Sequence, residues 1–302
     1  MIDIIIPAYN AHSTMGRTLA SIAKQINRDL LKVYIINDGS EKKYDYIIDN
    51  FSSLLDITEI EITNSGPGKA RQVGIDSSKN EFIVFMDADD TLYDDNSILN
   101  LLSHISEADL VQGSFIEKTD SEPKVLEPQY CYLHGKMYRR SVIEKNNIKF
   151  DEKRRYEGDI YEDSTFNQLY TFYCNNVVNI SEIVYVYEYN QNSITKSNVD
   201  YAKNLINFVD AMTWLAKEVK KRKLSKNYDI AWNFCIICFH IYFNYLMVYD
   251  KYDFDFKIMK DIKAVYNKFI AYLNFDEQLR IYNFFNYPVI PIISFYDFMK
   301  KE

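Results

Sequence analysis

The sequence predicts an α/β fold with a mostly parallel central sheet, followed by a mainly α-helical C-terminal region. Through the first 116 residues, short apolar runs alternate with segments of helical character. Strand–helix–strand repetition at this spacing is typical of βαβ units and a parallel sheet. From about residue 200 the chain has helical character to its end. We therefore expect two domains, residues 1–199 and 200–302.

The strands of the N-terminal half are predicted from apolar runs that suit strands buried on both faces. The five predicted strands are Ile2–Ile6, Val33–Asn37, Glu59–Thr63, Phe82–Met86 and Leu110–Phe115. Ser13–Ile26 has apolar residues three or four positions apart, which is the spacing of an amphipathic helix. The other predicted helices of this half are Tyr44–Leu55, Lys69–Ser78 and Ser97–Ile105.

The alternating pattern ends after Phe115. Residues 117–129 are polar and contain two prolines, which predicts a loop. Beyond the loop we expect helices at 135–146 and near 164–174, and short extended pieces near 177–189. The helices of the C-terminal region are expected at about 201–223, 228–249, 256–273 and 276–286.

Composition and charge exclude several classes of protein. With 47% apolar and 26% charged residues, the chain can form a sizeable core and is not disordered as a whole. A net charge of −8 argues against general nucleic-acid binding. The N-terminus lacks the features of a signal peptide, and the four cysteines form no secreted pattern. We therefore expect a cytoplasmic protein.

Two C-terminal segments bear on membrane contact. Ile230–Tyr249 is uncharged over 20 residues, but it contains Asn233 and His240, which favours a buried helix over a transmembrane span. Residues 217–226 hold six basic residues and one acid. Two interpretations stay open for this stretch: a solvated helix end, or contact with an anionic membrane surface at the inner face. The oligomeric state is left open as well.

Each of the first four predicted strands runs into a polar cluster. The clusters are Pro7–Asn10, Asp38–Ser40, Asn64–Lys69 and Asp87–Asp90. The carboxyl ends of parallel strands lie at one edge of a sheet, where open α/β sheets bind ligands. We therefore expect the four clusters to line one crevice.

The acidic cluster after the fourth strand suggests a cation. Asp87 and Asp89 are two positions apart, so in extended chain their side chains point the same way. Like charges this close are unfavourable, and Mg²⁺ or Mn²⁺ shared with phosphate oxygens would relieve the repulsion. The alternative is an ordinary turn, although three aspartates in four positions exceed what a turn needs.

The other clusters carry weaker signals. Asp38 is either a nucleobase contact or part of a turn capped by Ser40. Gly66–Lys69 is either a phosphate-binding loop without the usual spacing or simply a helix start. Arg71, on the following helix, is a candidate partner for a phosphate or an aspartate.

Taken in order, six motifs resemble those of inverting family-2 glycosyltransferases with the GT-A fold. They are PAYN, DGS, NSGPGKARQVG and DADD, then HGKMYRRS from His134 and YEDSTF from Tyr161. The resemblance covers about residues 2–195. The chain departs from the family pattern at Tyr161, where Gly is common, at Gln72, where Asn is frequent, and at Gly135. These departures bear on the choice of acceptor more than on the chemistry.

The resemblance implies a nucleotide-sugar donor, most often a UDP-sugar, bound with Mn²⁺ or Mg²⁺. It implies donor binding by Pro7, Tyr9, Asn10, Asp38, Asn64, Gly66, Lys69, Arg71, Asp87 and Ala88. Asp89 would be the principal metal ligand and Asp87 the second, with His134 a weaker candidate. The cation would neutralise charge on the leaving diphosphate.

The resemblance also assigns a general base and a closing loop. Asp163 matches the base position and has Glu162 beside it, although Asp163 could also cap the helix at 164–174. Tyr185, Tyr187, Ser193 and Thr195 match a family loop that could close over the donor. Lys136, Arg139 and Arg140 either pair with an anionic group or form a solvated helix face.

The expected activity is thus metal-dependent, inverting transfer of a sugar from a nucleotide-sugar to a hydroxyl acceptor. The acceptor would be a glycan, a lipid-linked molecule or a protein, in the synthesis of surface polysaccharide, glycolipid or glycoprotein glycan. Two alternatives are a nucleotidyltransferase and a non-catalytic scaffold subunit that binds the nucleotide-sugar.

Overall fold

The computed structural model describes residues 1–128, 132–151 and 161–189, and residues 207, 210–211, 214–215 and 217–224. The chain divides into two compact units, Met1–Ile194 and Thr195–Glu302. The expected boundary between residues 199 and 200 lies outside the described residues and stays a prediction. The run Ile230–Tyr249 and the expected helices at 228–249, 256–273 and 276–286 also lie outside them.

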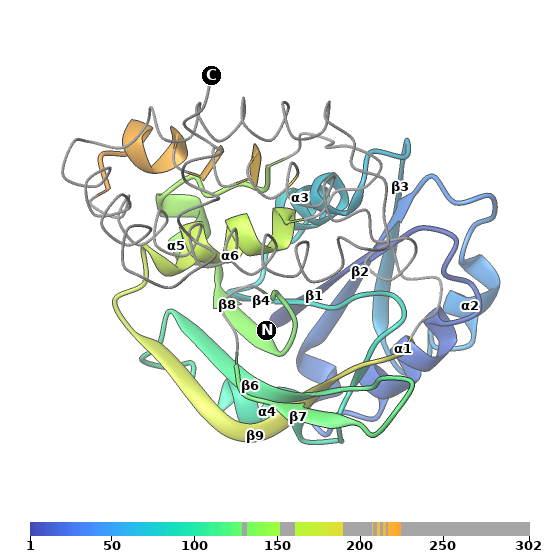
Figure 1. Cartoon of the computed structure of the whole chain (residues 1–302). Helices are drawn as coiled ribbons and strands as arrows, with labels where there is room; N and C mark the ends of the chain where they lie inside the picture. The colour runs from blue at the N-terminus through green and yellow to red at the C-terminus, as the bar shows by residue number, and fades with distance from the viewer. Residues whose placement is uncertain are drawn as a thin grey trace, which may run out of the picture. The chain divides into compact units, whose positions relative to one another are not determined.

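The first unit is built on a mixed sheet in the order β3-β2-β1-β4-β8-β6-β9-β5, with β7 paired to β6 (Figure 1). The strands are β1 Ile2–Ala8, β2 Leu31–Asp38, β3 Asp56–Ile62, β4 Phe82–Phe85, β5 Thr91–Leu92, β6 Leu110–Glu117, β7 Lys124–Leu126, β8 Lys136–Arg139 and β9 Val177–Tyr187. Strands β1 to β4 are parallel to their neighbours within this group. The expected parallel sheet is therefore confirmed for the first four strands.

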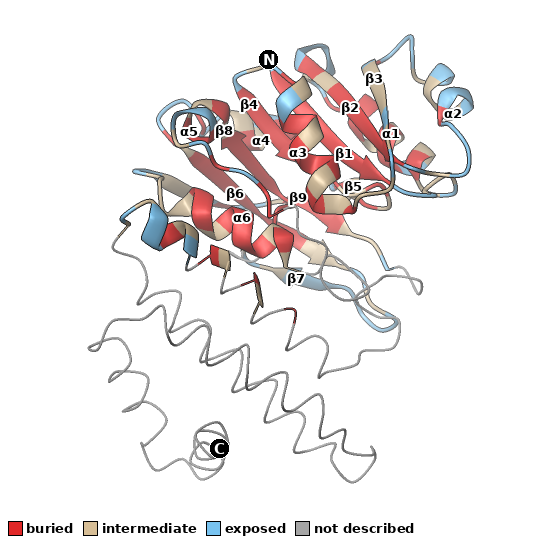
Figure 2. Ribbon diagram, turned by 90° about the horizontal axis from the view of Figure 1, so that it is seen from above, coloured by how far each residue is buried: buried red, intermediate tan, exposed pale blue. Residues whose placement is uncertain are grey.

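Helices lie on both faces of these parallel strands. They are α1 Met15–Ala23, α2 Asp45–Asp49, α3 Pro67–Ser77, α4 Ser97–Leu102, α5 Arg140–Lys145 and α6 Glu162–Thr171, with a 3-10 turn at Arg28–Leu30. Ile4 and Ile6 join the core cluster that contains the apolar face of α1. Ile5 faces the other way, and a Cβ added to Gly74 of α3 would overlap with it. Figure 2 shows β1, β2 and β4 buried between these layers.

The second half of the sheet differs from the expectation. The helix expected at 135–146 is wrong for its first half, where β8 pairs antiparallel with β4 and β6. Only α5 is helical in this stretch. As a result Lys136 is a buried strand residue and shares no helix face with Arg140. The expected loop contains β7, and the expected extended pieces form the single strand β9.

Strand β3 forms one edge of the sheet and carries acidic residues. Asp56 and Glu61 are exposed there, and Glu59 is half-buried. Lys32 of β2 pairs with Asp56 at 3.4 Å, and Lys43 pairs with Glu61. Charged side chains on an edge strand oppose pairing with a strand of another chain.

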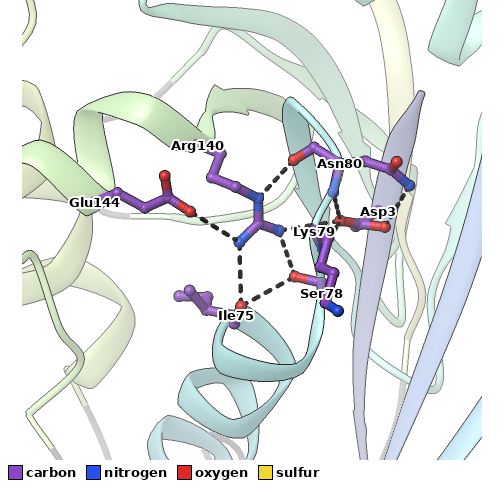
Figure 3. A network of polar contacts seen from close by, with 7 residues as sticks. All are labelled: Asp3, Ile75, Ser78, Lys79, Asn80, Arg140 and Glu144. Atoms are coloured by element: carbon purple, nitrogen blue, oxygen red, sulfur yellow. Dashed lines mark hydrogen bonds and ion pairs between the residues drawn. The ribbon is translucent and has the colours of Figure 1, made fainter.

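A buried ion-pair network lies at the amino end of β1 (Figure 3). Nη2 of Arg140 donates to Oδ2 of Asp3 at 3.0 Å, and its Nη1 donates to the carbonyl of Ile75 at 3.1 Å. The backbone amides of Lys79 and Asn80 donate to the same Asp3 oxygen, at 3.0 and 2.6 Å. The network ties β1, the end of α3 and the start of α5 together.

Candidate active site

The order of the strands places a crevice beside β1. The chain leaves β1 for β2 on one side and later returns to β4 on the other side. Loops at the carboxyl ends of β1 and β4 therefore diverge, and ligands of open α/β sheets bind at such a point. Three of the expected polar clusters follow β1, β2 and β4, and the fourth follows β3. Contacts between these clusters define the site.

Asp38, at the end of β2, fixes the loop that precedes α3. Its Oδ1 accepts a hydrogen bond from the backbone amide of Ser65 at 2.6 Å, and its Oδ2 accepts one from Gly66 at 2.8 Å. Gly66 has a φ of 91°, which glycine adopts without strain. A Cβ at Gly39 would lie 2.8 Å from the backbone nitrogen of Asn64, so the two loops pack closely. The expected nucleobase contact of Asp38 stays a prediction.

The loop after β1 is joined to the loop after β2. The amide of Asn10 donates to Oγ of Ser40 at 2.9 Å, and Oδ1 of Asn10 accepts from the amide of Glu41 at 3.0 Å. Pro7 is buried within β1, whereas Tyr9 is exposed. An open hollow adjoins this loop and is lined by Asn10, His12, Glu41, Lys42, Lys43, Tyr46 and Ile47.

The Asp87–Asp90 turn contains aspartates in different environments. Asp87 has a side chain that is 37% exposed, and its Oδ1 accepts from Nη2 of Arg71 at 2.8 Å. Asp89 is half-buried. Asp90 is fully buried, and its carboxylate accepts from the hydroxyl of Tyr185 at 2.8 Å and from the amide of Glu188 at 2.8 Å. Asp90 therefore attaches the turn to the end of β9, and Asp87 and Asp89 are the candidates for a cation.

Two neighbouring elements support the backbone of this turn. Oγ1 of Thr18, on α1, donates to the carbonyls of Ala88 at 3.0 Å and Asp90 at 2.8 Å. Nη2 of Arg17 donates to the carbonyl of Asp89 at 2.6 Å. No local pattern in the sequence predicts these contacts, which link α1 to the turn across about 70 positions of the chain.

Arg71 connects the turn to α6. Its Nη1 donates to Oε1 of Glu162 at 2.7 Å, while its Nη2 holds Asp87. Burial alone would lower the pKa of Arg71, but Asp87 and Glu162 outweigh it and raise that pKa. Burial, helped by the neighbouring Asp163, raises the pKa of Glu162, whereas the charge of Arg71 and its hydrogen bond oppose that rise and favour the carboxylate. The bridge from Arg71 to Glu162 was not predicted, although Glu162 was noted beside the base position.

Asp163 lies in the first turn of α6. The N-cap of this helix is Tyr161, so the alternative of Asp163 as N-cap is wrong. Oδ1 of Asp163 accepts from the amide of Ser164 at 2.6 Å. Burial raises the pKa of Asp163, with Asp87 adding to the rise, whereas Arg71 opposes it. Asp163 follows Glu162, which pairs with Arg71, and a carboxylate with a raised pKa suits proton transfer near neutral pH.

His134 lies in a stack of aromatic rings that includes Tyr185, the residue that donates to Asp90. Its ring stacks on Tyr132 and Tyr185 with ring centroids 4.9 and 4.8 Å away, and the ring of Phe115 meets it edge-on with a centroid distance of 4.6 Å. Nε2 is buried and has no hydrogen-bond partner among the described residues. Burial lowers the pKa of His134 to about 3. The ring therefore packs as a neutral group, and its weaker assignment to a metal stays a prediction.

The candidate donor set for a divalent cation is limited to the carboxylates of Asp87 and Asp89. The described part of the chain contains no group of three or more His, Cys, Asp or Glu side chains that could hold an ion. Asp87 and Asp89 nevertheless fit a Mg²⁺ or Mn²⁺ ion of the kind that proteins bind through one or two carboxylates plus substrate phosphates. Ser193 and Thr195 of the expected closing loop lie outside the described residues.

Comparison with known proteins gives a family match over more than half of the chain. Residues 3–172 match the family described as Glycosyl transferase family 2. An uncharacterized glycosyltransferase of Bacillus subtilis (strain 168), EpsJ, is 25% identical over 65% of this chain and 63% of its own length. The poly(ribitol-phosphate) beta-N-acetylglucosaminyltransferase TarS of Staphylococcus aureus (strain Mu50) is 25% identical over 61% of this chain and 35% of its own length. The chain thus covers less than two thirds of each of these relatives.

Solved structures share the fold. Residues 1–349 of S. aureus TarS, in complex with UDP-GlcNAc, superimpose with a TM-score of 0.74 at 19% identity, covering 91% of this chain and 82% of that one. The mannosyltransferase PcManGT of Pyrobaculum calidifontis, with GDP-Man and Mn²⁺, gives a TM-score of 0.55 at 12% identity, covering 99% and 83%. The expected GT-A fold is confirmed. No helix among the described residues is both long and apolar enough to cross a bilayer, and membrane-surface contact by residues 217–226 stays a prediction.

Proposed function

Because the chain belongs to glycosyl transferase family 2, we propose that it is an inverting, metal-dependent enzyme that moves a sugar from a UDP-sugar to a hydroxyl acceptor. The observation that carries this proposal is the chain of ion pairs from Asp87 through Arg71 to Glu162, with Asp163 next to Glu162 in the first turn of α6. It brings a candidate site for a cation and diphosphate next to a candidate base. TarS, a structural neighbour, is in complex with UDP-GlcNAc, so UDP-GlcNAc is the first donor to test.

The donor side of the site is formed by loops that hold each other in place. Asp38 orders the loop before α3 by accepting two backbone hydrogen bonds, and its remaining lone pairs can accept from a uracil ring. Asn10 and Tyr9 lie on the adjoining loop after β1. A cation on Asp87 and Asp89 would neutralise charge that develops on the departing diphosphate.

The acceptor side is the first turn of α6. A hydroxyl is a weak nucleophile until a base removes its proton, and in this proposal Asp163 takes that proton. The new bond forms between the acceptor oxygen and the anomeric carbon while the bond from that carbon to the UDP oxygen breaks. A single displacement from the face opposite UDP inverts the configuration. Relatives in this family include a glycosyltransferase of poly(ribitol-phosphate), which supports a surface glycopolymer as the acceptor class.

The donor and the metal can be tested together. The purified chain with UDP-GlcNAc and Mn²⁺ should release UDP and transfer sugar, and Mn²⁺ with UDP should raise its melting temperature. EDTA should abolish both effects. The variant Asp89→Asn should lose the Mn²⁺-dependent part of both. Asp95→Asn, an exposed aspartate six positions further along, is the matched control and should behave as the wild type.

The base can be tested separately from donor binding. Asp163→Asn should lower kcat by about 10²–10⁴-fold, because general base catalysis is worth roughly that factor. The Kd for UDP should stay near the wild-type value. Loss of UDP binding in this variant would show that Asp163 holds the structure of the site rather than the proton. Retention of configuration in the product, seen by NMR, would refute the single displacement.

A further inference from the structure

We propose that Arg71 is a positioning residue that couples the donor side of the site to the base. One nitrogen of its guanidinium holds Asp87 in the turn after β4, and another holds Glu162, the residue before Asp163. Arg71 thus sets where the first turn of α6 stands relative to a bound donor. This inference rests on the proposed function, since it gives Asp87 to the donor side and Asp163 to the acceptor side.

The two ion pairs of Arg71 are directional, and the pair with Glu162 is buried on both sides. The distances are 2.8 Å from Nη2 to Asp87 and 2.7 Å from Nη1 to Glu162. The side chains of Arg71 and Glu162 are 8% and 6% exposed. Since water has little access to the pair with Glu162, it cannot easily replace that partner, and the planar guanidinium fixes the angle between the two bonds. The bridge joins segments that are 91 positions apart in the chain.

A second contact holds Glu162 from the same helix. A Cβ added to Gly68 of α3 would lie 3.0 Å from Cγ of Glu162 and 3.3 Å from its Cβ. Gly68 lies about one turn before Arg71 on α3, so two residues on the same face of α3 contact Glu162, the first residue of α6. Glu162 is therefore held both by charge and by close packing.

The start of α6 also has a local strain that outside contacts must offset. Its N-cap, Tyr161, has a φ of 82°, in the left-handed region that non-glycine residues rarely adopt. The helix has no side-chain hydrogen bond at its N-cap. A strained backbone of this kind persists when surrounding contacts determine it. The ion pair from Arg71 to Glu162 is such a contact, and it acts one residue after the strained position.

Breaking the ion pair between Arg71 and Glu162, while that between Arg71 and Asp87 remains, should have a specific effect. Glu162→Gln keeps the shape of the side chain and removes its charge, so Arg71 keeps Asp87 but loses its charged partner on α6. The Kd for UDP with Mn²⁺ should stay within about twofold of wild type, whereas kcat should fall about 10–100-fold because the base is displaced. In wild type, UDP with Mn²⁺ should slow hydrogen exchange in the first turn of α6. In Glu162→Gln this slowing should disappear.

A double-mutant cycle separates coupling from independent effects. Arg71→Lys retains a charge but lacks the planar guanidinium that reaches Glu162 and Asp87 with two separate nitrogens. If Arg71 acts on the base through Glu162, the double variant should lose no more kcat than the Arg71→Lys variant alone. Asp3→Asn is the matched control, because Asp3 is also a buried carboxylate paired with an arginine. It should lower the melting temperature without changing kcat per folded molecule.

Gly68→Ala tests the same point without removing a charge. The added methyl group presses on Glu162 from α3, so kcat should fall while UDP affinity is kept, even if Glu162→Gln does not fold. If folded Glu162→Gln or Gly68→Ala keeps the wild-type kcat, or if the losses of kcat in the double-mutant cycle are additive, Arg71 does not position the base. The proposed function would be unaffected by either result. A wild-type chain that neither binds UDP nor transfers sugar would overturn both the positioning role of Arg71 and the proposed function.

Discussion

The Asp3–Arg140 network allows a quantitative test, because one guanidinium meets two carboxylates in opposite environments (Figure 3). Asp3 is fully buried and lies 3.0 Å from Nη2 of Arg140. Glu144 lies 4.0 Å from Nη1 of the same residue, and its side chain is 63% exposed. Asp3→Asn and Glu144→Gln make the same chemical change, so the burial and the closer contacts of Asp3 should separate their effects on stability.

The expected magnitudes follow from the environment of each carboxylate. Asp3→Asn removes the charge that compensates a buried guanidinium, and breaking a buried pair on one side costs about 3–5 kcal/mol. Backbone amides of Lys79 and Asn80 also lose part of their acceptor. Glu144→Gln should cost at most about 1 kcal/mol, as exposed pairs do. At roughly 2–4 °C per kcal/mol, the melting temperature should fall by about 6–20 °C for Asp3→Asn.

Differential scanning calorimetry and urea titration of both variants measure these differences. The network lies at the amino end of β1, away from the Asp87 turn, so UDP affinity of the folded Asp3→Asn protein should be unchanged. Equal destabilisation by the two substitutions would refute the reasoning, because it would mean that burial of the partner does not determine the cost. A Glu144→Gln variant less stable than Asp3→Asn would refute it as well.

Two further predictions concern single residues near the site. Burial lowers the pKa of His134 to about 3, so the unfolded chain takes up a proton near pH 6.5 that the native chain does not. The neutral ring of His134 therefore contributes stability above pH 6.5, and this contribution is lost as the pH falls toward 3. His134→Phe should make urea-measured stability less sensitive to acid, whereas replacing the exposed His104 with Gln should not; equal acid sensitivity of wild type and His134→Phe would contradict this. Tyr161 has a φ of 82°, so Tyr161→Gly should be about 1–2 kcal/mol more stable than Tyr161→Ala, the reverse of the usual order in helices. A higher melting temperature for Tyr161→Ala than for Tyr161→Gly would argue against strain at this position.

The parallel half of the sheet could be predicted because its strands are buried on both faces. In β1 and β2 nearly every residue is buried, so the sequence shows unbroken apolar runs such as Ile4–Ile6. The polar residues that follow the strands mark the edge where they end. The same regularity located Asp38, Asp87 and the start of α3, and the contacts between their loops agree with a shared crevice.

The antiparallel half could not be predicted from local pattern. Met137 and Tyr138 are apolar residues between basic ones, which suits a helix and a strand equally well. What decides is the pairing of Tyr138 with Ile83, which lies 55 positions earlier in the chain. The contact of Arg71 with Glu162 has the same origin, since nothing local in either segment specifies its partner. The spacing of apolar residues in a single sequence does not reveal which distant segments pair in this way.

The acidic residues along β3 have a consequence for the behaviour of the chain in solution. Half of the hydrogen-bonding groups on an outermost strand face no neighbour within its own sheet. On β3 these groups lie among Asp56, Glu59 and Glu61, and Lys32 and Lys43 pair with only two of the three carboxylates, so a second copy approaching side by side would meet an edge of net negative charge. Concentrated samples should therefore resist precipitation at low ionic strength and lose that resistance as salt screens the repulsion.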